Sequence, residues 1–177
     1  MKRTTTLLLT IALTFLLPSS EAFAGKGNGK PRPFKAEFTT EFFNSNVTPL
    51  GVFTTVVEGT GNATHLGEVA LVGVHNFSFT DFTNPFLGGP AYNGELVLTA
   101  ANGDVLNATY GGDISFLGDP IFPFLIEFTI TFDGGTGRFE NATGEASCVG
   151  LTTIVPVPDS PLFTGTSQFV FEGEISY

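Results

Sequence analysis

Apolar and polar residues alternate without a break from Phe124 to Asp133. The apolar set is Phe124, Ile126, Phe128, Ile130 and Phe132, and the polar set between them is Glu127, Thr129, Thr131 and Asp133. Successive side chains of a β-strand point to opposite faces, so a period of two predicts a strand with one buried face. Whatever fold this chain adopts must bury a face made of phenylalanine and isoleucine.

Runs of the same kind recur along the chain and are separated by turn signals. They cover residues 34–42, 52–58, 66–79, 95–100, 104–110, 144–154 and 163–177. Gly59 to Asn62 is expected to end the second run. Residues 81–93, with two prolines and two adjacent glycines, are expected to form a lid or rim loop. Asn102-Gly103 between two such runs predicts a β-hairpin.

About eight strands without a helical period predict an all-β domain. An antiparallel β-barrel and a β-sandwich both satisfy this pattern. Closure of a barrel removes the exposed edges that phenylalanine-rich strands would otherwise offer for aggregation. We therefore predict an antiparallel β-barrel of about eight strands, with the sandwich as the alternative.

The N-terminal residues have the features of a secretory signal peptide. A basic start is followed by an apolar run from Leu7 to Leu17 and by the small-x-small ending Ala22-Phe23-Ala24. A membrane-spanning helix needs about 20 apolar residues, so this run is too short to remain in a bilayer. We expect a signal peptide at 1–24, a flexible leader at 25–33 and a single barrel domain at 34–177, in a secreted or periplasmic protein with no membrane span after cleavage.

The expected mature chain is strongly acidic. Removal of residues 1–24 leaves 5 basic and 16 acidic side chains, a net charge of −11. Such a surface repels nucleic acids. The single Cys148 excludes an internal disulfide and is expected to be a buried, inert thiol. His65 and His75 are ten residues apart, too far along one strand to share a metal, so we predict neither a metal nor a cofactor.

A glycine-rich segment, Gly-Gly-Thr-Gly-Arg-Phe-Glu-Asn-Ala-Thr-Gly at 134–144, joins two of the predicted strands. Its glycines are predicted to supply the tight turn: Gly134, Gly135, Gly137 and Gly144. The segment resembles the Gly-Gly-Thr-Gly-(Arg/Lys)-Phe…Ala-x-Gly motif of dirigent proteins and the wider allene oxide cyclase-like barrel group. The resemblance implies an eight-stranded antiparallel barrel with an apolar central cavity, in several cases secreted and often trimeric. Residues 59–67 look similar to a segment of uncharacterised exported bacterial proteins.

Two basic side chains are candidate ligand anchors. Arg138 is the only lysine or arginine after Lys35. Near a cavity mouth its guanidinium would bind a carboxylate or phenolate, whereas in a structural role it would tie the turn to Glu140, Glu145 or carbonyls at the barrel end. His65 would act as a general acid or base if a carboxylate oriented it, and is otherwise a hydrogen-bonded structural residue.

Glu127 and Phe128 occupy opposite faces of the clearest strand. Cavity carboxylates are thought to assist proton transfer in dirigent-like proteins, so the resemblance makes Glu127 a candidate base if the polar face lines the lumen. If the phenylalanine face packs inward, Glu127 is only solvated. Phe128 would then contact a ligand.

The leading functional hypothesis is an exported barrel that binds a small apolar or aromatic molecule in or near its lumen, with Arg138 or His65 as anchor. One alternative is a cofactor-free dirigent- or cyclase-like enzyme that guides a reactive intermediate. Another is a structural or surface-interaction barrel with a solid core.

Overall fold

The computed structural model describes residues 29–81, 83–84, 87–119, 121 and 123–177. The predicted signal peptide and the first four residues of the predicted leader lie outside these ranges. The first strand begins at Arg32, so Arg32 and Pro33, which were expected in the leader, pair with the last strand of the chain.

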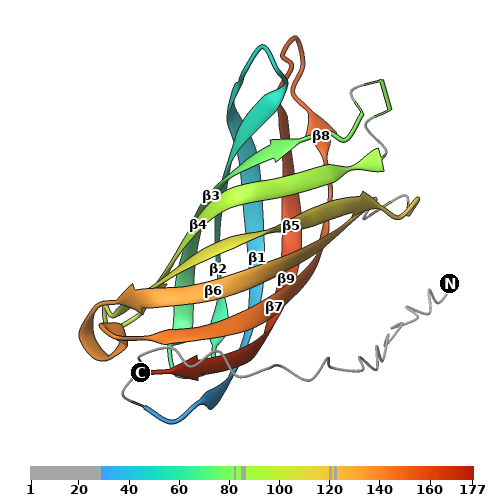
Figure 1. Cartoon of the computed structure of the whole chain (residues 1–177). Helices are drawn as coiled ribbons and strands as arrows, with labels where there is room; N and C mark the ends of the chain where they lie inside the picture. Colours follow the sequence, from blue (N-terminus) through green and yellow to red (C-terminus); the bar gives the residue numbers. More distant parts are fainter. Residues whose placement is uncertain (1–28, 82, 85–86, 120, 122) are drawn as a thin grey trace, which may run out of the picture.

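The described residues form an antiparallel β-barrel with the strands in sequence order (Figure 1). The strands are β1 (Arg32–Val47), β2 (Val52–Ala63), β3 (Gly67–Ser78), β4 (Gly89–Ala100), β5 (Val105–Phe116), β6 (Phe124–Gly135), β7 (Thr143–Thr152), β8 (Val155–Pro156) and β9 (Phe163–Ser176). β1 pairs with β9 from Arg32 to Phe43 and closes an eight-stranded barrel. The short β8 is one extra strand that pairs with the start of β9. The predicted barrel is confirmed, and the sandwich is not formed.

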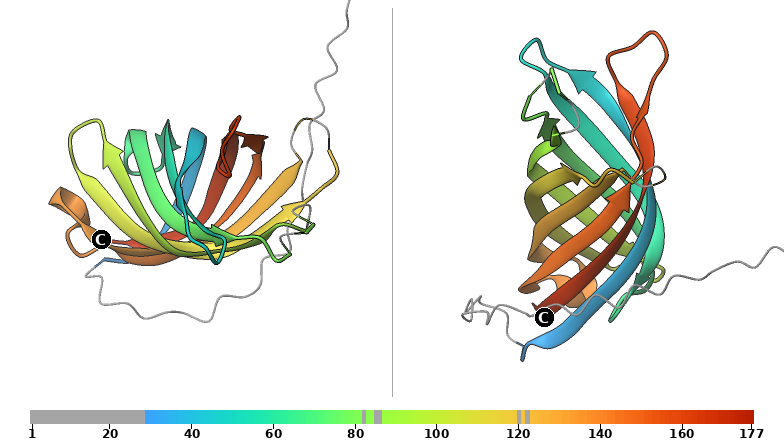
Figure 2. Two further views of the ribbon diagram at one scale, coloured as in Figure 1. Left: turned by 90° about the horizontal axis from the view of Figure 1, so that it is seen from above. Right: turned by 90° about the vertical axis from the view of Figure 1, so that its right-hand side faces the viewer.

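The two ends of the barrel carry different connections (Figures 1 and 2). The end where β1 begins and β9 ends also holds the hairpin at 101–104 and the glycine-rich segment, which forms a short 3-10 turn, η2 (Gly137–Phe139). The opposite end holds the turn at 48–51 and the described parts of the longer loops between β3 and β4, β5 and β6, and β8 and β9. We call the half of the lumen next to the end where β1 begins the packed half, and the half next to the opposite end the hollow half.

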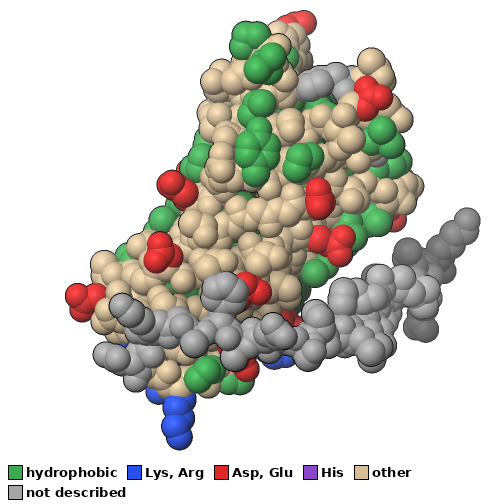
Figure 3. Space-filling model, viewed as in Figure 1, with side chains coloured by type: hydrophobic (Ala, Val, Ile, Leu, Met, Phe, Trp, Pro, Cys, Tyr) green, Lys and Arg blue, Asp and Glu red, His purple; other side chains and the backbone are tan. Residues whose placement is uncertain are grey.

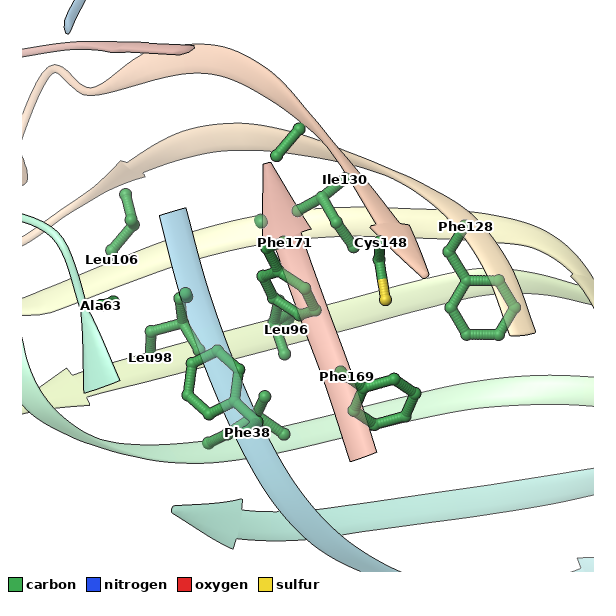
Figure 4. Packing of buried hydrophobic residues seen from close by; sticks show 14 of the residues in the cluster. Phe38, Ala63, Leu96, Leu98, Leu106, Phe128, Ile130, Cys148, Phe169 and Phe171 are labelled. Carbon is green, nitrogen blue, oxygen red and sulfur yellow. The ribbon is translucent and has the colours of Figure 1, made fainter. Parts of the chain in front are cut away.

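Apolar side chains fill the packed half (Figure 4). The largest of those less than 2% exposed are Phe34, Phe139, Leu98, Leu106, Ile175 and Val69. The rings of Phe34 and Phe132 meet edge to face with centroids 4.7 Å apart, and Phe139 from η2 packs 5.0 Å from the ring of Tyr177. The glycine-rich segment therefore closes this end of the barrel by inserting Phe139 into the core.

Two strands are longer than their sequence patterns predicted. The expectation that Gly59 to Asn62 ends a strand was wrong, because β2 continues to Ala63 and pairs with β1 throughout this stretch. A Cβ atom on Gly61 would collide first with the backbone carbonyl oxygen of Glu37 on the neighbouring strand, and it would lie only 2.6 Å from the ring of Phe38. Glycine is needed there because the backbone of β1 and a core phenylalanine ring both approach closely, and not to turn the chain. β4 begins at Gly89, so the expected loop at 81–93 is shorter than predicted.

The two predicted connections lie where the sequence indicated. The hairpin between β4 and β5 turns at Asn102-Gly103, and Gly103 has a φ of +87°. The glycine-rich segment joins β6 to β7. Gly134 and Gly137 have φ of +72° and +59°, Gly135 ends β6, and Gly144 lies in β7.

Candidate ligand-binding cavity

A cavity occupies the hollow half of the lumen. It offers about 70 Å³ to the centres of water-sized spheres. Apolar side chains make up most of its wall: Phe42, Val57, Leu71, Phe77, Phe79, Leu96, Ile114, Ile126, Phe128, Ile130, Ile154, Phe163, Phe169 and Phe171. The remaining lining residues are Asn44, Thr55, Gly73, His75, Tyr110, Cys148, Thr152 and Ser167. Figure 4 shows Phe128, Cys148 and Phe169 at one side of the lumen, away from Leu98 and Leu106 of the packed half.

Four phenylalanine rings cluster at the open end of this cavity. Phe79 lies 5.0 Å from Phe77, 5.7 Å from Phe53 and 5.7 Å from Phe163, each in an edge-to-face arrangement. Phe53 belongs to β2, Phe77 to β3 and Phe163 to the start of β9, while Phe79 directly follows β3; all of them except Phe53 line the cavity. Aromatic pairs of this kind contribute about 0.5–1.5 kcal/mol each beyond burial alone.

A histidine and a tyrosine form a hydrogen-bonded pair inside the apolar wall. His75 on β3 and Tyr110 on β5 lie with Nδ1 and the hydroxyl oxygen 2.8 Å apart. The ring of Phe128 packs against both, with centroid distances of 6.1 Å to His75 and 5.6 Å to Tyr110. A Cβ atom on Gly73 would lie 3.0 Å from the tyrosine hydroxyl oxygen. The absence of a side chain at Gly73 thus leaves room for this pair.

Burial keeps the titratable groups of the cavity uncharged. It lowers the pKa of His75 to about 4 and raises the pKa values of Tyr110 and Cys148 well above their ordinary ranges. Loss of hydration disfavours whichever form carries charge, which explains the opposite directions. At neutral pH the imidazole, the phenol and the thiol are therefore all neutral.

The other polar side chains of the cavity bond mainly to one another. Asn44 Nδ2 donates to Thr55 Oγ1 at 2.9 Å, and Asn44 Oδ1 accepts from the backbone N–H of Phe163 at 2.9 Å. Ser167 Oγ donates to Thr152 Oγ1 at 2.8 Å. These bonds tie neighbouring strands together near the mouth.

Arg138 lies at the far end of the barrel from the cavity. Its Nε is 3.3 Å from Asp104 Oδ2, and its guanidinium carbon lies 5.1 Å from the centroid of the Phe139 ring. The side chain is 45% exposed. In the structure Arg138 thus ties the turn to the neighbouring hairpin, through Asp104 where Glu140 or Glu145 had been expected.

The remaining predicted site residues are not brought together. His65 has a φ of +70° in the turn before β3, and its Nε2 lies 3.0 Å from the carbonyl oxygen of Pro33 at the packed end. Glu127 is exposed on the outer face of β6. Phe128, the next residue, is buried and lines the cavity beside His75. Of the predicted site residues, Phe128 alone lies in the cavity.

The sequence interpretation missed the His75–Tyr110 pair. In the sequence, the spacing of His75 from His65 excluded a shared metal site and favoured a structural role, and no pattern singled out Tyr110. A signal was present, because His75 stands at an even offset from the inward-facing Leu71, Gly73 and Phe77. A titratable residue in the apolar register of a strand is a candidate for burial and hence for a perturbed pKa.

Among the described residues, no group of three or more histidine, cysteine, aspartate or glutamate side chains is placed to hold a metal ion. In the same part of the chain, no helix is long and apolar enough to cross a membrane.

Comparison with known proteins finds no matching family model, no matching curated protein and no matching solved structure. The likeness to dirigent and allene oxide cyclase-like proteins therefore rests on the glycine-rich motif, and the case for function rests on the cavity itself.

Proposed function

We propose that this barrel binds a small, mostly apolar molecule in the hollow half of its lumen. The observation that carries the proposal is the cavity lined by phenylalanine, leucine and isoleucine with one neutral histidine–tyrosine pair inside it. Concave, largely apolar sites with a few convergent polar groups are the usual form of small-molecule sites. The anchor in this proposal is the His75–Tyr110 pair, because Arg138 and His65 lie at the other end of the barrel.

Native mass spectrometry of the protein from its own host tests this proposal. A non-protein mass released on denaturation is the expected result. Ile126→Phe adds bulk to the cavity wall and should abolish that mass. Leu125→Phe, at the neighbouring outward-facing position of β6, is the matched control and should retain it.

An additional measurement covers the case in which the ligand is lost on purification. A molecule that binds only the native state raises the melting temperature. We expect methylenecyclohexane or cyclohexanone to raise the melting temperature of the native chain and of Leu125→Phe, but not of Ile126→Phe. A bare polypeptide whose melting temperature neither compound changes would contradict the proposal and favour the structural barrel.

A cofactor-free enzyme is the second candidate, because an unprotonated imidazole and a phenol lie together in the cavity. Such a pair can accept and donate a proton. Chromatography of the molecules extracted from native protein and from His75→Gln separates the two functions. An enzyme should yield different compounds from the two proteins, whereas a binding protein should yield one and the same compound, in a smaller amount from His75→Gln because half of the anchoring pair is altered.

We further infer that the chain acts outside the cytoplasm, as the signal-peptide pattern at 1–24 predicts. Trimer formation, which the dirigent resemblance implies, belongs to the same proposal. The native mass spectrum that detects a ligand also reports the number of subunits. Sequencing the N-terminus of the exported protein would test cleavage after Ala24.

A further inference from the structure

The His75–Tyr110 pair has hydrogen-bonding capacity that the protein does not use. His75 is 6% exposed, and its Nε2 makes no hydrogen bond to another protein group in the described part of the chain. The tyrosine hydroxyl has His75 as its hydrogen-bond partner there. Among the described residues, Thr40 Oγ1 is the side-chain atom that is fully buried without a partner, so His75 Nε2 is not sealed inside the wall. Nε2 therefore keeps access to the cavity that His75 lines, and it can bind a polar group that enters there.

Both ways of placing the protons lead to the same requirement. If the tyrosine O–H donates to Nδ1, then Nε2 carries the hydrogen and is a free donor, while the hydroxyl oxygen can still accept. If Nδ1–H donates to the hydroxyl oxygen, then the tyrosine O–H is the free donor and Nε2 is a free acceptor. In either case the pair offers one donor and one acceptor, which a hydroxyl group satisfies fully and a carbonyl oxygen satisfies in part.

The cavity offers no counter-ion to a charged ligand. None of the described residues that line it is lysine, arginine, aspartate or glutamate. The other titratable residues among those that line the cavity are Tyr110 on β5 and Cys148 on β7, and burial keeps both neutral. A carboxylate or an ammonium group would lose its hydration here and find no opposite charge in return.

The cavity volume limits the size of the molecule. A water molecule needs roughly 10–15 Å³ of space for its centre, so a cavity of about 70 Å³ accommodates about five to seven waters. A six-membered ring with one substituent is of comparable size.

We propose that the cavity selects a neutral molecule about the size of a six-membered ring that carries one hydroxyl or carbonyl oxygen, and that this oxygen binds to the His75–Tyr110 pair. This inference rests on the proposed function and names the ligand class for the same site. The size and apolar wall of the cavity favour the six-membered ring of the ligand, and the histidine–tyrosine pair selects its oxygen.

Four six-membered-ring probes test the selection on the full chain by calorimetry at pH 7. Methylenecyclohexane and cyclohexanone have nearly the same shape and differ in the oxygen. Cyclohexanol carries a hydroxyl, and cyclohexylammonium carries a charge. We expect cyclohexanone and cyclohexanol to bind about tenfold more tightly than methylenecyclohexane, the size of effect that one well-made buried hydrogen bond gives. Cyclohexylammonium should bind at least about tenfold more weakly than cyclohexanol because it is charged.

The double variant His75→Phe with Tyr110→Phe removes both polar partners and keeps two aromatic rings. In this variant the oxygen-containing probes should lose their advantage, and methylenecyclohexane should still bind. Tyr92→Phe removes a tyrosine hydroxyl that does not line the cavity and should leave all affinities unchanged.

The ¹⁵N spectrum of the native protein tests the contact without relying on that variant. We expect cyclohexanone to shift the ring nitrogens of His75 and methylenecyclohexane to leave them in place. His65→Gln assigns the spectrum, because the chain has two histidines.

The outcomes separate this inference from the proposed function. Equal affinity for methylenecyclohexane and cyclohexanone, or tight binding of cyclohexylammonium, would overturn the oxygen selection and leave the binding function intact. If no probe binds and no ligand is released in the mass spectrometer, both proposals fail.

Discussion

The two halves of the lumen are built by the same strands but filled differently. On β4, Leu98 is fully buried in the packed half, and Leu96, one inward position further along, lines the cavity. Gly73 on β3 lies directly opposite Leu96, and beyond this level the inward positions of neighbouring strands hold His75 and Tyr110 in place of further aliphatic side chains. A barrel of eight strands has room for little more than its own side chains. A few small or polar residues are therefore enough to convert a solid core into a cavity.

The largest expected effect compares the two leucines of β4 directly. Leu98→Ala should cost about 4–5 kcal/mol of unfolding free energy, and Leu96→Ala about 2–3 kcal/mol. Both substitutions remove the same side-chain atoms, but Leu96 already faces a cavity and has fewer packing partners to lose. Urea denaturation followed by circular dichroism measures both values. Equal losses would show that the hollow half is as well packed as the other.

The next effect concerns the pH dependence of stability that His75 produces. Burial lowers its pKa to about 4 in the folded chain, while the unfolded chain has a value near 6.5. Between these values the unfolded state binds more protons, so this contribution is complete above pH 6.5 and is lost as the pH falls towards 4. Its full size is about 3 kcal/mol.

His75→Gln isolates that contribution, because glutamine does not titrate. Between pH 7 and pH 4 the native chain should lose about 3 kcal/mol more stability than the variant. Urea denaturation at several pH values measures the difference, and the carboxylates common to both proteins cancel in the comparison. Parallel curves would mean that His75 is not buried as a neutral base.

Gly73→Ala should disturb the hollow half more mildly. The added methyl group would press on the tyrosine hydroxyl oxygen, with a loss of about 1–2 kcal/mol. The same substitution in a Tyr110→Phe background should cost less, because the hydroxyl is gone. A double-mutant cycle, measured by urea denaturation, gives the coupling energy between the two substitutions. A coupling energy of zero would show that the residue at position 73 does not interact with the tyrosine hydroxyl.

The smallest effect is expected at the packed end. Arg138→Gln removes a partly exposed ion pair with Asp104 and should cost less than about 1 kcal/mol. Asp104→Asn should cost about the same. Neither substitution should change ligand release in the mass spectrometer, in contrast to Ile126→Phe. A ligand lost from Arg138→Gln would move the site to the other end of the barrel.

The basic side chains are also unevenly distributed between the two ends of the barrel. The described lysines and arginines, Lys30, Arg32, Lys35 and Arg138, all lie at the packed end, and Figure 3 shows basic atoms at that end of the visible face and acidic side chains spread over it. The anchors chosen from the sequence were charged or exposed residues at this end. The groups that face the cavity are neutral and buried, so their importance comes from position rather than charge.

The local sequence pattern was sufficient to predict the strands with strict alternation. It failed for glycine, because a glycine can either form a turn or lie within a strand where a neighbouring group needs the space. The Phe124–Asp133 pattern predicted β6, and Asn102-Gly103 predicted the hairpin. Gly61 was read as part of a turn, although it lies within β2 opposite a phenylalanine ring. Its neighbour in space, Phe38, is 23 residues away in the chain, and no local pattern contains that contact.

The sequence by itself determined that this chain forms β-strands with a phenylalanine-rich buried face, because the period of two and the turn residues act over a few neighbouring positions. Only the tertiary structure decided that the strands close into a barrel, through the pairing of β1 with β9, and which part of the interior is solid. Filling depends on the summed volume of inward side chains from all eight strands at one level of the barrel. His75 and Tyr110 are 35 positions apart, and closure of the barrel makes them one site.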